Sequence, residues 1–303
     1  MEDRLKKVAI YAQSYSLSSE KEIKALIKAL EKYNVVVFIE KEFYELLSQH
    51  DLLNKKYPVF ASFDDLSDSF DALFSVGGDG TILRAVTYVR DLKIPILGIN
   101  SGRLGFLATV QKKEIKEAID LLMKGKFSVQ ERTLLQLKTT PETNTFSDVN
   151  FALNEITIAR RNTTSMIGIK TYLNEEYLTN YWADGLIIAT PTGSTGYSLS
   201  CNGPVILPDS TSLIITPIAP HNLNARPIVI PEETTIQLEI SAREKDFLIS
   251  LDSRITTVPQ ETKIYIEKAP FTIKTIQLED QSYLKTLRKK LLWGEDIRNQ
   301  ASS

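Results

Sequence analysis

The chain has 303 residues, of which 43% are hydrophobic and 24% are charged, and its 36 Lys and Arg are balanced by 38 Asp and Glu. This length exceeds the usual size of one compact core, so we expect two domains. The balanced charge excludes a protein that binds nucleic acid through a global excess of positive charge, and we expect no nucleic-acid partner.

The single cysteine, Cys201, excludes an intramolecular disulfide framework and fits a reducing compartment. One Cys and 2 His cannot supply a zinc site of the common Cys/His type, so we expect no protein-bound metal of that kind. No apolar run approaches the roughly 20 residues of a membrane span, and Met1–Lys7 lacks the apolar stretch of a signal peptide. The sequence therefore predicts a cytoplasmic protein with no membrane partner.

Strand-like and helix-like segments alternate in the first part of the chain. Ser19 and Glu22 form a capping-box pattern at the start of one expected helix. Because alternating strands and helices are typical of a parallel sheet, we expect an α/β domain over residues 1–126. The expected strands are Val8–Ala12, Val35–Ile39, Asp71–Val76 and Ile94–Ile99, and the expected helices are Ser19–Tyr33, Phe43–Leu47, Ile82–Val89 and Lys113–Met123, the last with Gly125 beyond it as a stop.

From Phe127 onward, short runs of Thr, Val, Ile and Leu are separated by turn residues. This texture indicates antiparallel strands, and we expect an all-β sandwich over residues 127–279. Trp182 is interpreted as a core aromatic of this sandwich. The expected strands are Leu134–Thr139, Asn154–Ala159, Met166–Leu173, Gly185–Ala189, Ser212–Pro217, Thr234–Ile240, Phe247–Leu251, Lys263–Glu267 and Thr272–Gln277.

The chain ends in a helical pattern over Tyr283–Trp293. Leu284, Leu287 and Leu291 share one face of it and need a surface to pack on. We expect this C-terminal helix, at about residues 280–303, to pack back on the first domain.

The sharpest local motif is Gly77-Gly78-Asp79-Gly80-Thr81, directly after an expected strand and before an expected helix. Glycines let backbone amides approach a ligand, and amides at a helix N-terminus suit phosphate. The carboxylate of Asp79 has three open interpretations: it binds a metal, it takes a proton from a hydroxyl nucleophile, or it hydrogen-bonds the backbone of a tight turn. Neither a GxxxxGK[ST] loop nor a GxGxxG motif is present, which argues against a P-loop nucleotidase and an ordinary Rossmann dehydrogenase.

Two further segments carry polar side chains near expected strands. Asp184–Pro204 is rich in hydroxyl-bearing and small residues, which suit a turn around a sugar or a phosphate but also occur in ordinary surface loops. Asn154 and Glu155 stand together at a strand start, where both reach one ligand only if the strand bends or begins there. The alternative for this pair is solvent-facing polarity, and for Asp184 it is a simple turn before Gly185.

Four motifs occur in one order along the chain. Together they resemble the bacterial NAD kinase family. The first motif alone would also fit phosphofructokinases and diacylglycerol-type lipid kinases, but the long hydroxyl-rich segment and the Asn-Glu pair decide against those. The motifs are GGDGTILRA (Gly77–Ala85), NSGRLGFLA (Asn100–Ala108), LNE (Leu153–Glu155) and DGLIIATPTGSTGYSLSCNGP (Asp184–Pro204).

The resemblance implies transfer of a phosphoryl group from ATP, or from another phosphoryl donor, to the 2′-hydroxyl of the adenosine ribose of NAD. The donor would carry a divalent cation, most simply Mg²⁺, and the protein would form a homo-oligomer, a tetramer or a dimer. Asp79 would be the general base, Gly80 a backbone contact, Arg84 a phosphate contact, Asn154 and Glu155 ligands of the ribose hydroxyls, and Asp184 a contact on the nicotinamide side. The rest of the dinucleotide would be wrapped by Thr192, Thr195, Gly196, Tyr197, Ser198, Leu199 and Ser200, with Tyr197 lying against a base.

The sequence departs from the family pattern at three positions. Gly196 stands where relatives commonly have Ala, Trp182 where many have a basic residue, and Ser253 where Gly is frequent. These departures leave the phosphoryl donor and the acceptance of NADH open. A dinucleotide-sensing module without enzymatic activity is the alternative from another functional class, and it would need no carboxylate aimed at the ribose.

Overall fold

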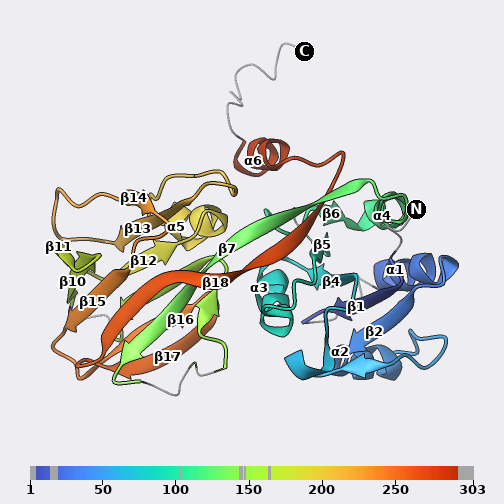
Figure 1. Ribbon diagram of the computed structural model, residues 1–303, viewed down its shortest axis with the longest axis horizontal. Helices are drawn as coiled ribbons and strands as arrows, with labels where there is room; N and C mark the ends of the chain where they lie inside the picture. The colour runs from blue at the N-terminus through green and yellow to red at the C-terminus, as the bar shows by residue number, and fades with distance from the viewer. Residues whose placement is uncertain are drawn as a thin grey trace, which may run out of the picture. The chain divides into compact units, whose positions relative to one another are not determined.

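The computed structural model describes residues 5–13, 20–102, 104–142, 146, 148–162 and 165–292. The expected capping box at Ser19 and the expected helix end at Trp293 lie outside these residues. The chain divides into two compact units: the first comprises residues 1–130 and 273–303, and the second comprises residues 131–272. Figure 1 labels the elements of both units, with colour running from blue at the N-terminus to red at the C-terminus.

The first unit is built on a parallel sheet with strand order β5-β4-β1-β2-β3. The end of strand β18 and the short strand β6 also pair in parallel with β5. The strands are β1 (Lys7–Tyr11), β2 (Val36–Glu40), β3 (Val59–Phe60), β4 (Ala72–Gly77), β5 (Ile96–Asn100) and β6 (Val110–Gln111), and the helices are α1 (Glu20–Lys32), α2 (Lys41–Gln49), α3 (Asp79–Val89), α4 (Ile115–Met123) and α6 (Tyr283–Leu291).

Helices cover both faces of this sheet because its central strands are apolar on both sides. Helix α1 buries Ile23, Leu26 and Leu30 in one core with residues of α2, α4 and alternate sheet positions. On the opposite face, a Cβ at Gly98 would lie 2.5 Å from the side chain of Ile82, so this glycine gives α3 room to approach β5. The sheet therefore places the end of β4 and the start of α3 at its carboxyl edge, where α/β proteins bind ligands.

The second unit is an antiparallel β-sandwich. One sheet has the order β14-β13-β12-β9-β16-β17, and the other contains β11-β10-β15-β18 together with β7 and β8. Isoleucines and leucines from both sheets form one buried core. The strands are β7 (Phe127–Thr140), β8 (Phe151–Ala152), β9 (Glu155–Arg160), β10 (Ile167–Leu173), β11 (Glu176–Ala183), β12 (Gly185–Ala189), β13 (Ser212–Ile218), β14 (Ile228–Pro231), β15 (Ile236–Ser241), β16 (Asp246–Leu251), β17 (Arg254–Pro259) and β18 (Lys263–Leu278), and a short helix α5 spans Tyr197–Ser200.

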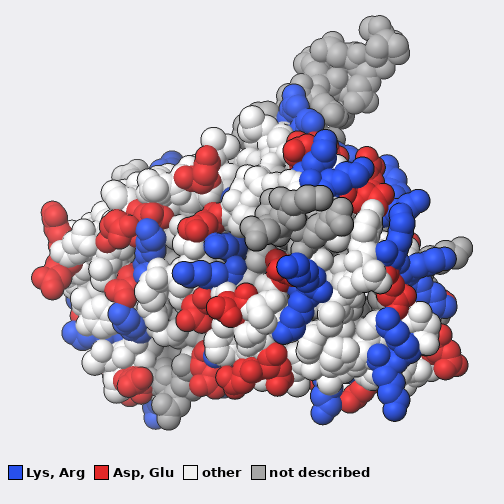
Figure 2. Space-filling view, turned by 45° about the vertical axis from the view of Figure 1, so that its right-hand side comes forward, with Lys and Arg blue, Asp and Glu red and all other residues white. Residues whose placement is uncertain are grey.

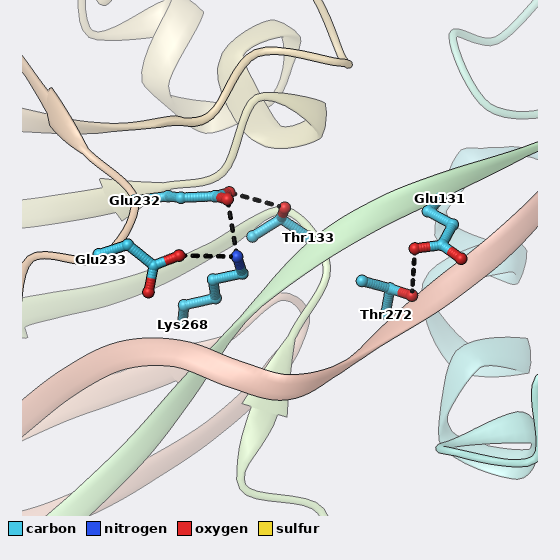
Figure 3. A network of polar contacts seen from close by, with 6 residues as sticks. All are labelled: Glu131, Thr133, Glu232, Glu233, Lys268 and Thr272. Atoms are coloured by element: carbon cyan, nitrogen blue, oxygen red, sulfur yellow. Dashed lines mark hydrogen bonds and ion pairs between the residues drawn. The ribbon is translucent and has the colours of Figure 1, made fainter.

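A polar network ties the long strands β7 and β18 to the turn after β14 (Figure 3). Lys268 Nζ lies 2.7 Å from Glu232 Oε1 and 3.0 Å from Glu233 Oε1. Thr133 Oγ1 donates to the other oxygen of Glu232 at 3.0 Å, so a nearly buried carboxylate is satisfied on both sides. Because burial of an unpaired charge is costly, this cluster stabilises the sandwich at that point.

The predicted fold class, an α/β domain with a parallel sheet plus an all-β sandwich, is confirmed. Gly125, expected to end a helix, lies two residues beyond the last residue of α4, where it has a positive φ of 70°, and its N–H donates to the carbonyl of Leu122. The two strands expected at 263–267 and 272–277 form one strand, β18, because its first half pairs with β15 and its last part with β5.

One expectation about packing was wrong. Trp182 is 44% exposed rather than in the core, because it lies on the outward side of β11, the last strand of its sheet. On α6, Leu284 is 57% exposed, and the buried residue of that helix is Thr286. Helix α6 belongs to the first unit and contacts Phe106 there: the ring centroid of Tyr283 lies 6.2 Å from that of Phe106, and Lys290 Nζ lies 5.6 Å from the same ring.

Candidate functional site

Asp79 is the first residue of α3, and its carboxylate is anchored by a distant loop. Oδ2 accepts a hydrogen bond from the backbone N–H of Phe106 at 2.7 Å, and Oδ1 accepts from Leu107 at 3.0 Å and Ala108 at 2.9 Å. A Cβ at Gly105 would lie 1.9 Å from Oδ1, so only glycine leaves room for this arrangement. Of the three interpretations of Asp79, hydrogen bonding to the backbone is therefore present. A carboxylate has about four lone-pair positions, so one position on Oδ2 stays open.

Gly80 and Arg84 lie on the exposed side of α3. Among the described residues, no atom outside the helix's own turn lies within 4 Å of a Cβ built at Gly80. Burial raises the pKa of Tyr11 to about 12 and also raises that of Tyr88, and the nearby guanidinium of Arg84 opposes both shifts. The first turns of α3 thus combine free space, backbone amides and a cation, a combination that suits an anion.

Asn154 and Glu155 come together beside Gly196 in the second unit. A Cβ at Gly196 would lie 2.9 Å from Glu155 Oε2 and 3.4 Å from Asn154 Nδ2. Within the described part of the chain, Asn154 Oδ1 and Glu155 Oε2 are buried without a hydrogen-bond partner. Strand β9 begins at Glu155, so Asn154 lies just outside the extended strand and both side chains can reach one ligand.

Burial favours the neutral form of the Glu155 carboxyl group. Burial, followed by the nearby charge of Asp252, raises the pKa of Glu155 to about 8, and the backbone N–H of Tyr197 opposes the shift. A neutral carboxyl group both donates and accepts hydrogen bonds, as does a sugar hydroxyl.

The hydroxyl-rich segment folds as two helical turns around Gly196. The first is a 3₁₀ turn over Thr192–Thr195, in which the Thr195 hydroxyl donates to the carbonyl of Thr192 at 3.4 Å, and the second is α5. The Ser198 hydroxyl is fully buried and bonds that of Thr216 at 2.8 Å, so its side chain holds the turn together.

The outer side of α5 carries the groups that solvent can reach. Tyr197 is 45% exposed, Ser200 is exposed, and Leu199 is half-buried. Burial raises the pKa of Tyr197, as do the neighbouring Cys201, Asp184 and Glu155. The structure therefore brings Tyr197 close to Glu155 and to Asp184, three residues that the sequence singled out separately.

Asp184 lies between β11 and β12 and forms an ion pair that the sequence did not indicate. Its Oδ2 is 2.9 Å from a guanidinium nitrogen of Arg160, and both side chains are partly exposed. The backbone N–H of Arg160 also donates to the carbonyl of Asp184 at 2.9 Å. The turn interpretation of Asp184 thus leaves out the ion pair, which fixes the carboxylate at the end of β9.

Sequence reasoning missed three residues that hold the Asn154-Glu155 pair. Thr190 Oγ1 donates to the carbonyl of Leu153 at 2.6 Å, and a Cβ at Gly193 would lie 2.0 Å from Asn154 O. Asp252 accepts hydrogen bonds from three consecutive backbone N–H groups of the pair's segment. Thr190 and Gly193 belong to a motif already noted, whereas Asp252 gave only the signal of an aspartate in a short turn.

No group of three or more His, Cys, Asp or Glu side chains that could hold a metal ion occurs among the described residues. No helix in that same part of the chain is long and apolar enough to cross a membrane. On the face drawn in Figure 2, Lys and Arg are interspersed with Asp and Glu, without a continuous basic surface.

Family models match both halves of the chain. The model of the ATP-NAD kinase N-terminal domain matches residues 8–127, and that of the ATP-NAD kinase C-terminal domain matches residues 153–278. An NAD kinase from Christiangramia forsetii is 53% identical over 97% of this chain and 100% of its own length. One from Flavobacterium psychrophilum is 54% identical with the same coverage.

Solved structures agree with this match. An NAD kinase from Archaeoglobus fulgidus in complex with ATP has a TM-score of 0.73 and 26% identity, with 94% of this chain and 98% of that chain covered. A yeast NADH kinase complexed with NADH has a TM-score of 0.87 over 98% of this chain and 90% of that chain, and its 24% identity makes it a likeness of fold.

Proposed function

The chain belongs to the ATP-NAD kinase family, and from this premise we propose that it transfers the γ-phosphoryl group of ATP to the 2′-hydroxyl of the adenosine ribose of NAD. The products are ADP and NADP, and one proton is released. We assign the phosphoryl chemistry to the domain of residues 1–126 with the C-terminal helix, and dinucleotide binding to the sandwich of residues 127–279.

The observation that carries the proposal is that Asn154 and Glu155, whose side chains both lie beside Gly196, each have a buried oxygen without a hydrogen-bond partner among the described residues. Asn154 Oδ1 and Glu155 Oε2 are buried among described residues that offer them no hydrogen bond. An unsatisfied buried polar atom is costly, and a ligand hydroxyl that bonds it recovers that free energy. A neutral amide and a neutral carboxyl group suit an uncharged sugar hydroxyl better than a cation, so we assign both residues to the ribose.

We assign the base role to Asp79, and specifically to its Oδ2. Oδ1 already accepts two backbone N–H bonds and Oδ2 only one, so Oδ2 retains a lone pair for a hydroxyl proton. As the ribose oxygen bonds to the γ-phosphorus and the bond from phosphorus to ADP breaks, Oδ2 accepts the hydroxyl proton. The three backbone bonds keep the carboxylate in one orientation during this step.

The exposed turns of α3 are assigned to a phosphate group. Backbone amides at Gly80 and the guanidinium of Arg84 lie one helical turn apart, so they can face the same anion. Mg²⁺ enters bound to the ATP substrate and neutralises charge on the leaving diphosphate.

The remaining site residues are assigned to the rest of NAD. Tyr197 offers a half-exposed ring on which a planar base can stack, and Asp184 lies near it for the nicotinamide side. The turns that hold Tyr197 in place are formed by Thr192, Thr195, Gly196, Ser198, Leu199 and Ser200.

We also propose that the enzyme works in the cytoplasm as a homo-oligomer, a tetramer or a dimer. Large apolar side chains of the second unit are exposed, Leu223 at 88% and Val229 at 45%, and surfaces of this kind are often covered by partner subunits. Light scattering on the purified chain measures the oligomeric state, and a monomer at micromolar concentration would contradict this part of the proposal.

The experiment that tests the activity uses the purified chain with ATP, Mg²⁺ and NAD, and detects NADP with a dehydrogenase specific for NADP. We expect NADP to accumulate in proportion to enzyme and to require both ATP and Mg²⁺. Parallel reactions with polyphosphate as donor and NADH as acceptor define the specificity. Tight NAD binding without NADP formation would contradict the kinase and favour a dinucleotide sensor.

A further inference from the structure

Asp252 occupies the turn between β16 and β17. Leu251 pairs with Arg254 across the hairpin, so Asp252 and Ser253 form a two-residue loop. The φ of Asp252 is 52°, in the left-handed region that Asp tolerates better than most residues and that such hairpin turns require. An aspartate suits this turn, but the turn alone does not explain where its carboxylate points.

The carboxylate points at the backbone of the Asn154-Glu155 pair. Oδ2 accepts a hydrogen bond from the N–H of Leu153 at 3.0 Å, and Oδ1 accepts from Asn154 at 2.8 Å and from Glu155 at 3.2 Å. The N–H of Asp252 in turn donates to the carbonyl of Glu155 at 3.0 Å. Four hydrogen bonds thus join one turn residue to three consecutive residues that are about 100 positions away in the sequence.

These four hydrogen bonds explain how the side chains of two adjacent residues can reach one ligand. In an extended strand, neighbouring side chains point to opposite faces and their N–H groups point in opposite directions. Three consecutive N–H groups that converge on one carboxylate require a bent backbone, which is a concave arrangement that binds anions. Because of this bend, the side chains of Asn154 and Glu155 both lie beside Gly196.

Hydrogen bonds of the side chains themselves supply only part of this orientation, through the backbone N–H of Tyr197 that bonds the Glu155 carboxyl group. Asn154 Oδ1 and Glu155 Oε2 have no hydrogen-bond partner among the described residues, so their place is set largely through the backbone. Arg254, in the same hairpin, donates hydrogen bonds from its guanidinium to the carbonyls of Val149 and Phe151. The hairpin thus also binds the backbone of the residues that precede the Asn154-Glu155 pair.

We propose that Asp252 is a positioning residue of the kinase site: by accepting three backbone N–H groups of Leu153–Glu155, its carboxylate holds Asn154 and Glu155 in the orientation that binds the ribose of NAD. This role rests on the proposed function for the identity of the ligand. Asp252 acts through the pair and does not touch the substrate.

The test compares Asp252→Asn with Ser253→Ala, a matched control that changes the same turn and leaves the carboxylate in place. The amide keeps the size of the side chain but replaces one acceptor oxygen with a donor that faces an N–H group. We expect Asp252→Asn to raise the calorimetric Kd and the KM for NAD about tenfold or more, with the KM for ATP unchanged within about twofold. Ser253→Ala should leave all three constants within about twofold of the parent.

A double-mutant cycle separates positioning from a general structural role. Glu155→Gln removes the carboxyl group that Asp252 is proposed to hold in place. In this background, Asp252→Asn should therefore change NAD affinity by less than about threefold. An equal loss of affinity in both backgrounds, or an equal rise in the KM for ATP, would overturn the positioning role.

A second variant covers the case in which Asp252→Asn does not fold. Asp252→Glu keeps the charge but moves the carboxylate by one methylene group, and we expect it to fold and to lose NAD affinity about tenfold. Unfolding of both variants, or normal NAD affinity in a folded one, would overturn the proposal. Absence of NADP formation by the parent chain would instead contradict the proposed function, whereas the NAD binding measurements do not depend on turnover.

Discussion

Asp79 in the first unit and Glu155 in the second are both acidic residues to which we assign a role, but their hydrogen-bonding surroundings are opposite. The carboxylate of Asp79 accepts three backbone N–H bonds, whereas Glu155 Oε2 is buried without a partner among the described residues. The group proposed for chemistry is therefore fixed before a ligand arrives. The group proposed for binding is incomplete until a ligand hydroxyl reaches it, and burial raises its pKa to about 8. Fixed geometry serves proton transfer, and an unsatisfied neutral group serves recognition.

The largest effect should come from Asp79→Asn. The amide is nearly isosteric but cannot accept the hydroxyl proton, so turnover should fall by about 10²- to 10⁴-fold. NAD affinity should change by less than about tenfold, which corresponds to roughly 1.4 kcal/mol. Steady-state turnover and calorimetric NAD binding on the folded variant measure the two quantities.

Asp71→Asn is the matched control for Asp79→Asn. Asp71 also accepts two backbone N–H groups in the first unit, those of Lys6 and Lys7, but it has no assigned role in the chemistry. Its replacement should leave turnover within about twofold of the parent. Near-normal turnover of Asp79→Asn would remove Asp79 from the base role, and lost NAD binding in a folded Asp79→Asn would make it an anchor of the ligand or of the loop at Phe106.

Glu155→Gln tests the other side of the comparison through pH. The folded-state pKa of Glu155 is about 8, above its ordinary value of 4.5. The folded protein therefore holds this proton more tightly than the unfolded chain does, and the resulting stabilisation is fully present below about pH 4.5. This stabilisation is lost as the pH rises through the folded-state value. The free energy of unfolding of the parent should therefore fall between about pH 6 and about pH 9 by roughly 1–3 kcal/mol more than that of Glu155→Gln.

Urea unfolding at several pH values measures this difference, with Glu279→Gln as the control. Glu279 forms an exposed ion pair with Lys126, so its replacement should leave the pH profile of stability unchanged. Parallel profiles for the parent and Glu155→Gln would show that Glu155 is ionised in the folded protein. Glu155→Gln should also raise the KM for NAD more than it lowers turnover.

Two glycines of the hydroxyl-rich segment should respond very differently to alanine. A Cβ at Gly193 would lie 2.0 Å from the backbone oxygen of Asn154, so the segment must shift. We expect Gly193→Ala to lower stability by about 1–3 kcal/mol and to raise the KM for NAD severalfold. A Cβ at Gly196 would instead meet the flexible end of Glu155 at 2.9 Å, and Gly196→Ala should raise the KM by less than about threefold. Equal effects of the two changes on KM would contradict the geometry of the pair.

The smallest effect should come from Asp184→Asn. Its ion pair with Arg160 is partly exposed, so the free energy of unfolding should change by less than about 1 kcal/mol. The KM for NAD should rise about two- to fivefold with turnover unchanged, because Asp184 is assigned to binding. A large loss of turnover with unchanged NAD affinity would move Asp184 into the catalytic group.

The strands that the sequence predicted are mostly those in the middle of a sheet. β4 and β5 of the parallel sheet and β12 of the sandwich are apolar on both faces, so their composition alone indicates a strand. The missed strands are β3, β6, β8, β11, β14 and β17. Four of them, β3, β11, β14 and β17, end a sheet, and β6 and β8 are short strands that each pair with a single strand, β5 and β7 respectively. An edge strand is half solvated and carries polar or exposed aromatic residues such as Trp182, so its pattern differs little from that of a loop.

The motifs located the candidate site residues, but the sequence could not predict what holds them. Asp79 and Asn154 stand out because of their neighbours in the chain, which is local information. The hydrogen bond that the N–H of Glu155 donates to Asp252 joins residues 97 positions apart, and the one that the N–H of Phe106 donates to Asp79 joins residues 27 positions apart. Such contacts depend on sheet pairing and turn geometry, which no local pattern in the sequence contains.

The most direct test of phosphoryl transfer to the adenosine ribose of NAD uses an analogue of NAD whose adenosine ribose lacks the 2′-hydroxyl. The purified chain is incubated with this analogue, ATP and Mg²⁺, and mass spectrometry follows the dinucleotide while calorimetry measures its binding. We expect the analogue to bind within about tenfold of NAD, because most contacts remain, and to gain no phosphoryl group. Formation of a phosphorylated dinucleotide from this analogue would contradict the 2′-hydroxyl as the acceptor.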